Sequence, residues 1–557
     1  MVDVIPPISS LDNSRPLRGS VTPIASSPPS ARWLERIVLG ILLAMLFLDR
    51  ARLCMDVLFR YTEEDQAVQW YGAREILRGA IHEPCFYGQP YNSCLEGYLA
   101  APLVMLGVPF YIACPLVTTL LGVLPFLVLT SLAWKRGWFF AAGFSIFLAV
   151  VMPMRYGIVT GIPRGFVTGL AAAGVAIWVL FRRTDNPKAW AEARDYFLFG
   201  MLLVLAWALN PNSLVVLLPL GVYALGTRFR RWRFWVAGFL GAAVASVYPL
   251  LRYQFYYVWH DDYRFHYRDQ TLRWSWDNFG KFLPHLDSSF GDFLPVEWHP
   301  AYVLLAIFLL LIVVLVWRRR YAGAMAGFSG VALVVTSFFC DRVQVSAEHV
   351  LLSYSRMFLG VPVLLVMLIV WLEMAKPVQT GWRWAYRTSF FALVVAAFFI
   401  VRNKNQHFDE QAAWEMRPFD SFAITPVDEI KRVTKKVQDA LDATGTTLVL
   451  IPNWELRPYN YAIPCMTIGQ SLYPGYERRT WRLHQECYPR YDRILVLGDA
   501  VPVDQLRKVD AKVRRISENP SLWVLNTQGR SVIKIAKLFG IQIRPFEIPP
   551  GSEAGKD

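Results

Sequence analysis

Long apolar segments alternate with short polar links along residues 33–401 of the chain. A run of about 17 to 25 apolar residues can cross the hydrocarbon core of a bilayer as a helix. We expect about eleven such spans: 33–52, 98–133, 138–154, 163–181, 195–210, 212–227, 232–250, 300–317, 322–339, 356–374 and 385–401. The segment 98–133 is longer than one span, and we expect it to contain a re-entrant or interfacial piece followed by a span. This pattern predicts a polytopic α-helical membrane protein.

The polar pattern changes in two long loops, 53–97 and 251–299, and in a tail, 402–557. In the tail, helix-like stretches ("VDEIKRVTKKVQDALDAT", "VDQLRKVDAKVRRI") alternate with strand-like runs ("TTLVLIP", "DRILVLG", "SLWVLN"). Alternating periods of this kind predict a small extramembrane α/β domain. Residues 1–32 are rich in Ser and Pro, and we expect a disordered cytoplasmic tail there.

Composition supports the membrane class, because 55% of the 557 residues are hydrophobic. The net charge of +14 comes from Lys and Arg gathered in short links such as "WKRG", "GTRFRRWR" and "WRRRY", which favours cytoplasmic loops over a nucleic-acid partner. We therefore predict a cell (inner) membrane protein with a cytoplasmic N-terminus. An odd number of spans then places both long loops and the C-terminal domain outside. Outside the membrane, Cys85 could form a disulfide with Cys94, and Cys465 with Cys487.

Three consecutive acids, Glu63, Glu64 and Asp65, follow the first expected span. With Thr62 as N-cap and Asp65 three residues on, "TEED" approximates a capping box. A cap uses only one carboxylate, however. The apolar positions that follow predict a helix lying on the membrane surface, which would place Asp65 at the boundary with water. There a carboxylate can act as a general base toward a hydroxyl. The sequence leaves both roles open.

Arginines lie where several expected spans reach the outer face, at Arg155, Arg164 and Arg356. Each guanidinium could hold a phosphate or could extend to lipid headgroups. A further charged group consists of Asp49, Arg52 and Asp56, which share one helical face and either pair internally or line a cavity.

The loop motif "HDDYRFH" (260–266) contains possible metal ligands but lacks a strong zinc spacing.

The segment "EEDQAVQWYGAREILRG" resembles the signature that follows the first helix in polyprenyl-phosphate-sugar-dependent glycosyltransferases with the GT-C fold. That group contains the protein O-mannosyltransferases and the lipid A aminoarabinose transferase. In this register Asp65 occupies the position of the first acid, and Gln66 stands where Glu is usual. Weaker resemblance continues through "GQPYNSCLEGYLAAPLVMLGV" and "SYSRMFLGVPVLLVML", the latter carrying Arg356.

The resemblance implies an inverting enzyme that moves a sugar from a polyprenyl-phosphate donor to a lipid, glycan or protein acceptor on the outer face. Asp65 would be the general base, with Glu64 beside it as a further catalytic candidate, and Arg356, Arg164 and Arg155 would bind the donor phosphate. The loop "MRYGIVTGIPRG" departs from the family pattern because it lacks a second acid. The candidates to replace that acid are Glu64, Glu96, Asp261 and Asp262. A divalent metal ion bound near Asp65 is a candidate cofactor.

Other functions remain open at this point. A transporter or flippase would also be polytopic, but carriers usually place acids inside their spans, whereas most acids here lie in the outward loops. A polymerase or ligase of surface polysaccharide would share the lipid donor. The sugar, the acceptor and the length of the polyprenol depend on pocket shape, which a single sequence does not specify.

Overall fold

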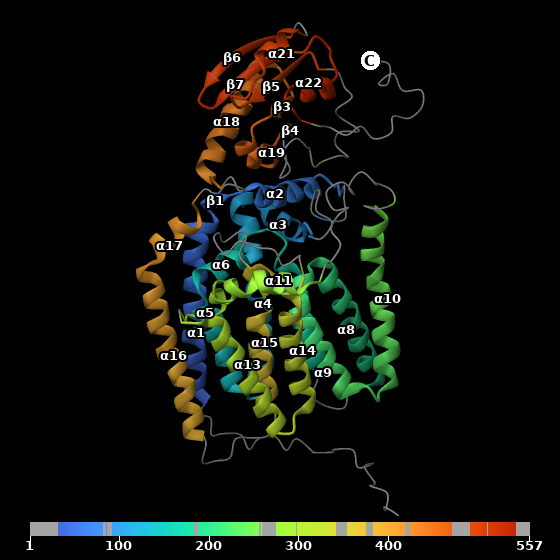
Figure 1. Cartoon of the computed structure of the whole chain (residues 1–557), viewed down its shortest axis with the longest axis vertical. Coiled ribbons are helices and arrows are strands. Elements are labelled where there is room, and N and C mark those ends of the chain that lie inside the picture. The colour runs from blue at the N-terminus through green and yellow to red at the C-terminus, as the bar shows by residue number, and fades with distance from the viewer. Residues whose placement is uncertain are drawn as a thin grey trace, which may run out of the picture.

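Each expected span coincides with a helix in the computed structural model (Figure 1). The helices are α1 (Arg32–Leu53), α4 (Phe110–Lys135), α5 (Phe139–Val151), α7 (Thr168–Phe181), α8 (Ala189–Leu209), α9 (Leu214–Arg228), α10 (Trp232–Gln254), α13 (Pro300–Trp317), α14 (Tyr321–Ser337), α15 (Val361–Glu373) and α16 (Arg383–Gln406). The structure describes residues 32–81, 85, 92–182, 188–255, 258, 274–296, 298–340, 354–374, 383–417, 424–469, 491–508 and 511–541.

Length and composition alone qualify only some of these helices as membrane spans. Within the described ranges, α4, α10 and α13 are long and apolar enough to cross a bilayer, and α5 forms a fourth candidate together with α6 (Met154–Gly161). The helices α3 (Leu95–Met105), α7, α14 and α15 are apolar but shorter. The number of crossings, about eleven, therefore stays a prediction.

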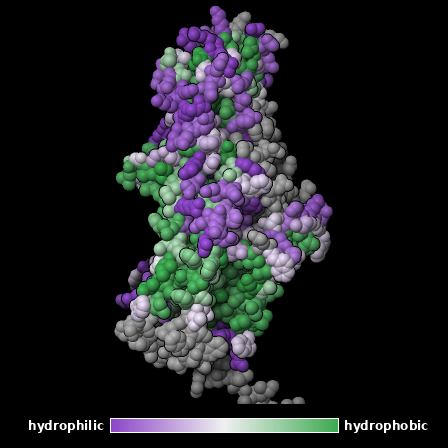
Figure 2. Space-filling model, turned by 90° about the vertical axis from the view of Figure 1, so that its left-hand side faces the viewer, coloured by the Kyte–Doolittle hydropathy of each residue, from purple (hydrophilic) through white to green (hydrophobic). Residues whose placement is uncertain are grey.

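The two ends of the helical bundle differ (Figure 1). The helices α2 (Glu64–Leu77), α3 and α11 (Trp276–Phe282) lie at one end, beneath the C-terminal strands, while the basic links after α9 and α13 lie at the other. Figure 2 shows hydrophobic residues gathered over the bundle and hydrophilic residues over the C-terminal region. Large apolar side chains point outward from bundle helices, as lipid contact requires: Phe47, Leu48, Phe239, Leu250, Leu310 and Phe328.

A sharp break separates α5 from α6, which meet at 91°. Pro153 occupies the break, where its missing N–H and its ring prevent α5 from continuing. The chain of α6 then leads into the turn 162–167 before α7 begins. This break brings Arg164 and Gly165 to the end of the bundle where α2 and α3 lie, because both contact acids of those helices.

A five-stranded sheet occupies the C-terminal region, in the order β4-β3-β5-β7-β6. Strands β3, β4 and β5 are parallel, whereas β7 runs antiparallel to β5 and β6 antiparallel to β7. Helices α18 and α19 pack on one face, and α21 and α22 on the other. The bounds are α18 (Val427–Thr444), β3 (Leu448–Ile451), α19 (Arg457–Ala462), β4 (Met466–Gly469), β5 (Arg493–Leu497), α21 (Val503–Lys508), β6 (Lys512–Glu518), β7 (Ser521–Asn526) and α22 (Val532–Leu538).

One element of the tail was predicted wrongly. The stretch 503–516 was expected to form a single helix, but α21 ends at Lys508 and β6 begins at Lys512. β6 is an edge strand, and its side chains are mostly exposed. Its conformation is therefore set by pairing with β7 and not by a local apolar pattern.

The C-terminal region packs directly on α2 and α3. A short antiparallel pair joins β1 (Tyr61–Thr62) to β2 (Thr425–Pro426). Trp70 and Ala73 of α2 share a hydrophobic core with α18 and α19. Most of α2 is therefore buried, because the bundle and the C-terminal region cover it from two sides. That α2 lies on the membrane surface stays a prediction.

Candidate functional site

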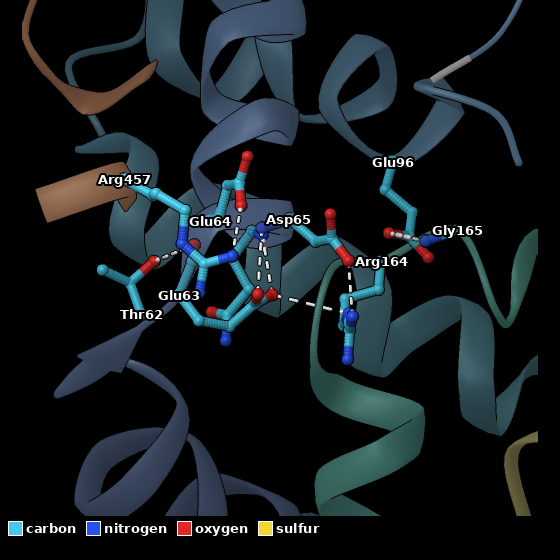
Figure 3. A network of polar contacts seen from close by, with 9 residues as sticks. Thr62, Glu63, Glu64, Asp65, Glu96, Arg164, Gly165 and Arg457 are labelled. Carbon is cyan, nitrogen blue, oxygen red and sulfur yellow. Dashed lines mark hydrogen bonds and ion pairs between the residues drawn. The ribbon is translucent and has the colours of Figure 1, made fainter. Parts of the chain in front are cut away.

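Four acids are buried together at the end of the bundle that faces the C-terminal sheet (Figure 3). Glu63, Glu64 and Asp65 lie at the start of α2, and Glu96 lies in the first turn of α3. None is more than 5% exposed. Burial disfavours an ionised carboxylate unless charges or hydrogen-bond donors compensate, so the partners of these acids decide what they can do.

Glu63 caps α2 through its side chain. Its two carboxylate oxygens accept hydrogen bonds from the backbone N–H groups of Asp65 and Gln66, each at 3.0 Å. The expected N-cap, Thr62, was wrong, because Thr62 belongs to β1 and pairs with β2. The tertiary contact with β2 thus moves the start of the helix by one residue.

Arg164 binds two of the acids from the side of the helical bundle. Its guanidinium donates a hydrogen bond to Asp65 and lies 3.4 Å from Glu63, and the arginine itself is 4% exposed. Burial raises the pKa of Glu63 to about 7, although Arg164 opposes this shift. The positively charged Arg164 side chain thus contacts the carboxylates of both Glu63 and Asp65.

Glu64 points to the other side of α2. Nη1 of Arg457, in α19, lies 3.4 Å from its carboxylate, and the two side chains are 2% and 4% exposed. Figure 3 shows Arg457 and Arg164 on opposite sides of the three acids. The N-terminus of α2 is therefore held by one arginine from the bundle and one from the C-terminal region.

Glu96 accepts a hydrogen bond of 2.9 Å from the backbone N–H of Gly165. Gly165 has a φ of +78°, and an added Cβ would meet the backbone oxygen of Ser93 at 3.2 Å, so this turn favours glycine. The short helix α3 does not span a bilayer, since eleven residues extend only about 16 Å. Burial raises the pKa of Glu96 to about 8, which the Gly165 N–H partly opposes.

Two of the three predicted phosphate-binding arginines are brought together. The guanidinium groups of Arg164 and Arg356 lie 5.4 Å and 5.8 Å from the centre of the same ring, that of Phe166. The Asn212 side chain ties this arrangement by donating to the backbone oxygens of Phe166 and Arg356, at 2.8 Å and 3.1 Å. Cation–π contact with one ring thus brings the two guanidinium groups to the same place.

Arg155 lies apart from this pair. Its guanidinium is 2.9 Å from Glu415 and 3.9 Å from Asp292. Two buried acids therefore compensate its charge, and it connects the start of α6 to α17 (Phe408–Glu415). This geometry favours a structural role over phosphate binding.

Some of the predicted acids and cysteines lie outside the described residues, and others can be compared with the structure. Asp261 and Asp262 lie outside the described residues, as does Cys487. Cys85 and Cys94 are thiols in the structure and form no bridge with each other. Among the described residues, no group of three or more His, Cys, Asp and Glu side chains is arranged to hold a metal ion.

The fold matches solved structures at low sequence identity. Crystal structures of ArnT from Cupriavidus metallidurans, in the apo state and bound to undecaprenyl phosphate, each align with a TM-score of 0.52 and 13% identity. Each alignment covers 89% of this chain and 98% of the other. The chain has the fold of ArnT. The GT-C resemblance inferred from the sequence is thereby confirmed at the level of the fold. No family model matches the sequence, and no curated protein matches it significantly.

Within the ArnT fold, some site residues were not predicted, among them Phe166, Asn212, Arg457 and Gly165. Arg457 lies about 390 positions from Glu64 in a short helix of the tail, and no local pattern marks it. Gly165 follows the predicted Arg164 directly, and "IPRG" is a turn signal that could have suggested its role. The arrangement places a hydrogen-bonded carboxylate, Asp65, beside a pair of arginines, which suits proton abstraction next to an anionic group.

Proposed function

We propose that the chain is a membrane glycosyltransferase that moves a sugar, with inversion, from a polyprenyl-phosphate donor to a lipid, glycan or protein acceptor. The observation that carries the proposal is that the buried carboxylate of Asp65 accepts a hydrogen bond from Arg164. The ArnT fold supports the donor class, because one ArnT structure is described as bound to undecaprenyl phosphate.

In the proposed reaction, Asp65 accepts the proton of an acceptor hydroxyl as its oxygen attacks the anomeric carbon of the sugar. The bond between that carbon and the phosphate oxygen breaks, and its electron pair remains on the phosphate. The guanidinium groups of Arg164 and Arg356 lie near the same ring, that of Phe166, so both positive charges are close together. They would stabilise the negative charge that develops on the phosphate. Glu64 points to the other side of α2, toward Arg457 and away from Arg164, which makes it a weaker candidate for the base.

The orientation in the membrane follows from charge. The basic links lie at the end of the bundle opposite α2 and the C-terminal sheet (Figure 1). By the positive-inside rule we propose that this basic end is cytoplasmic and that the site and the C-terminal domain, 402–557, are extracytoplasmic. The alternative of a transporter or flippase has less support, because the acids of the site lie at one end of the bundle and not at its midplane.

Native mass spectrometry in mild detergent tests the donor class. We expect a polyprenyl phosphate, or its sugar adduct, to co-purify with the wild type and to be depleted in Arg356→Ala. The matched control is Arg60→Ala, which removes an exposed arginine that pairs with Asp56 at 3.2 Å near the same end. Equal lipid occupancy in the wild type and Arg356→Ala would contradict the assignment of Arg356. Absence of such a lipid from all three proteins, even after addition of undecaprenyl phosphate, would contradict the donor class.

A further inference from the structure

The helix that carries Asp65 is fixed from two sides that belong to distant parts of the chain. Arg164 follows α6 in the bundle, and Arg457 lies in α19 of the C-terminal region. Arg164 contacts Glu63 and Asp65, whereas Arg457 contacts Glu64. The three acids therefore alternate between the two arginines along the start of one helix.

We propose that Arg457 is a positioning residue for Asp65, and that the C-terminal domain completes the catalytic site through the Glu64–Arg457 pair. This inference rests on the proposed function, in which Asp65 is the base. Arg457 acts through Glu64, whose carboxylate lies 3.4 Å from its Nη1.

Burial of the Glu64–Arg457 pair supports this role. Both side chains are at most 4% exposed, and a buried carboxylate that loses its cation is strongly destabilised. The start of α2 would then have to move so that Glu64 reaches water. The pair thus resists displacement of α2 more strongly than an exposed ion pair would.

Glu64 and Asp65 are rigidly connected. They are adjacent in the first turn of α2, and Glu63 accepts hydrogen bonds from the N–H groups of Asp65 and Gln66. A displacement of Glu64 would therefore move Asp65 with it. A shift of about 1 Å at a reacting group can reduce the rate by about 10²-fold.

Other contacts dock α2 and α19 on each other without involving the acids. Arg74 donates to the backbone oxygens of Tyr461 and Ile463, at 3.0 Å and 3.1 Å. The rings of Tyr71 and Tyr461 meet edge to face at 6.2 Å. Because docking has these separate contacts, the contribution of Arg457 to positioning can be separated from its contribution to docking.

The experiment uses the full chain in detergent or membranes, with the donor identified by mass spectrometry. We expect Arg457→Gln to reduce kcat by about 10- to 100-fold while the KM for the donor changes less than about threefold. Arg457→Lys keeps the charge and should recover most of the rate. Arg74→Gln is the matched control, since it weakens docking of α2 to α19 and should leave kcat within about threefold of the wild type.

Hydrogen exchange gives a readout that does not depend on the donor. The amides of Asp65 and Gln66, which donate to Glu63, should exchange about tenfold faster in Arg457→Gln and at nearly the wild-type rate in Arg457→Lys. The variant Glu64→Gln/Arg457→Gln leaves no buried charge at the pair, so it should be at least as active as Arg457→Gln alone.

Three results would overturn the inference. These are unchanged exchange in Arg457→Gln, faster exchange with unchanged kcat, or an equal loss of kcat in Arg74→Gln, which would indicate docking alone. The proposed function fails separately, if Asp65→Asn keeps normal turnover. Normal turnover in Arg457→Gln together with an inactive Asp65→Asn would reject only the role of Arg457.

Discussion

Two groups of charged residues follow one another around the end of α1, and their surroundings differ. The first group is Asp49, Arg52 and Asp56, and the second is Glu63, Glu64 and Asp65. We call them the helix group and the site group. Both are close to the membrane boundary in sequence, and the sequence left open whether each was structural or functional.

In the helix group, each acid has a basic neighbour along the helix or on α16. Asp49 pairs with Lys404 and lies 3.6 Å from Arg50, and Arg52 lies 3.6 Å from Asp56. Arg52 also stacks on the Phe408 ring at 4.1 Å. Internal ion pairing, one of the two interpretations of this group, therefore accounts for it.

In the site group, acids outnumber their arginines. Three buried carboxylates share ion pairs with two arginines, Arg164 and Arg457, and the nearby buried Glu96 accepts a hydrogen bond from the backbone N–H of Gly165. An excess of buried acid destabilises the fold, and such groups gather where chemistry requires them. The comparison teaches that the balance of charge in three dimensions distinguishes the two groups, although the sequence left the role of each open.

The largest effect is expected for Asp65→Asn. If Asp65 is the base, turnover should fall by about 10²- to 10⁴-fold, while donor binding is kept. Conversion of the donor to polyprenyl phosphate, followed by mass, measures this. The matched control is Glu75→Gln, on the same helix, whose carboxylate is 3.0 Å from Arg78. Normal turnover in Asp65→Asn would make the site group structural like the helix group.

A large loss of stability is expected for Arg164→Met. The substitution leaves Glu63 and Asp65 buried without this cation, and removal of one partner from a buried pair costs about 3 to 5 kcal/mol. Thermal unfolding in detergent, compared with Arg164→Lys, measures the loss. A melting temperature equal to that of the wild type would show that the carboxylates do not depend on Arg164.

A pH-dependent effect is expected at Glu96. Its folded pKa of about 8 lies above the ordinary value of 4.5, so the folded state binds the proton more tightly. Its contribution to stability is present below about pH 4.5 and is lost as pH rises through about 8. The melting temperature of the wild type should therefore fall with pH relative to Glu96→Gln. Parallel pH curves for the two proteins would contradict this prediction.

The smallest effect is expected at Asp409, which contacts Arg52 of the helix group. Its side chain is 88% exposed and lies 3.6 Å from Arg52. Exposed ion pairs contribute about 0 to 1 kcal/mol, so Asp409→Asn should change the melting temperature little and leave turnover unchanged. A loss comparable to that of Arg164→Met would remove the distinction between the two groups.

The sequence by itself determined the positions of the bundle helices, the GT-C resemblance and the acid-rich start of α2. Apolar runs as long as a bilayer is thick can bury their surface only as helices, so their pattern is local and readable. The strand runs of the tail, which coincide with β3, β5 and β7, were readable for a similar reason, since each carries buried residues toward both faces of the sheet.

Only the tertiary structure decided which charges meet. It replaced Thr62 by Glu63 as the cap, turned the predicted stretch around residue 512 into an edge strand, and placed Arg457 against Glu64. Each outcome depends on a partner from a distant part of the chain. The energy of a charge is set by its burial and by its neighbours in space, and neither is encoded in local sequence spacing.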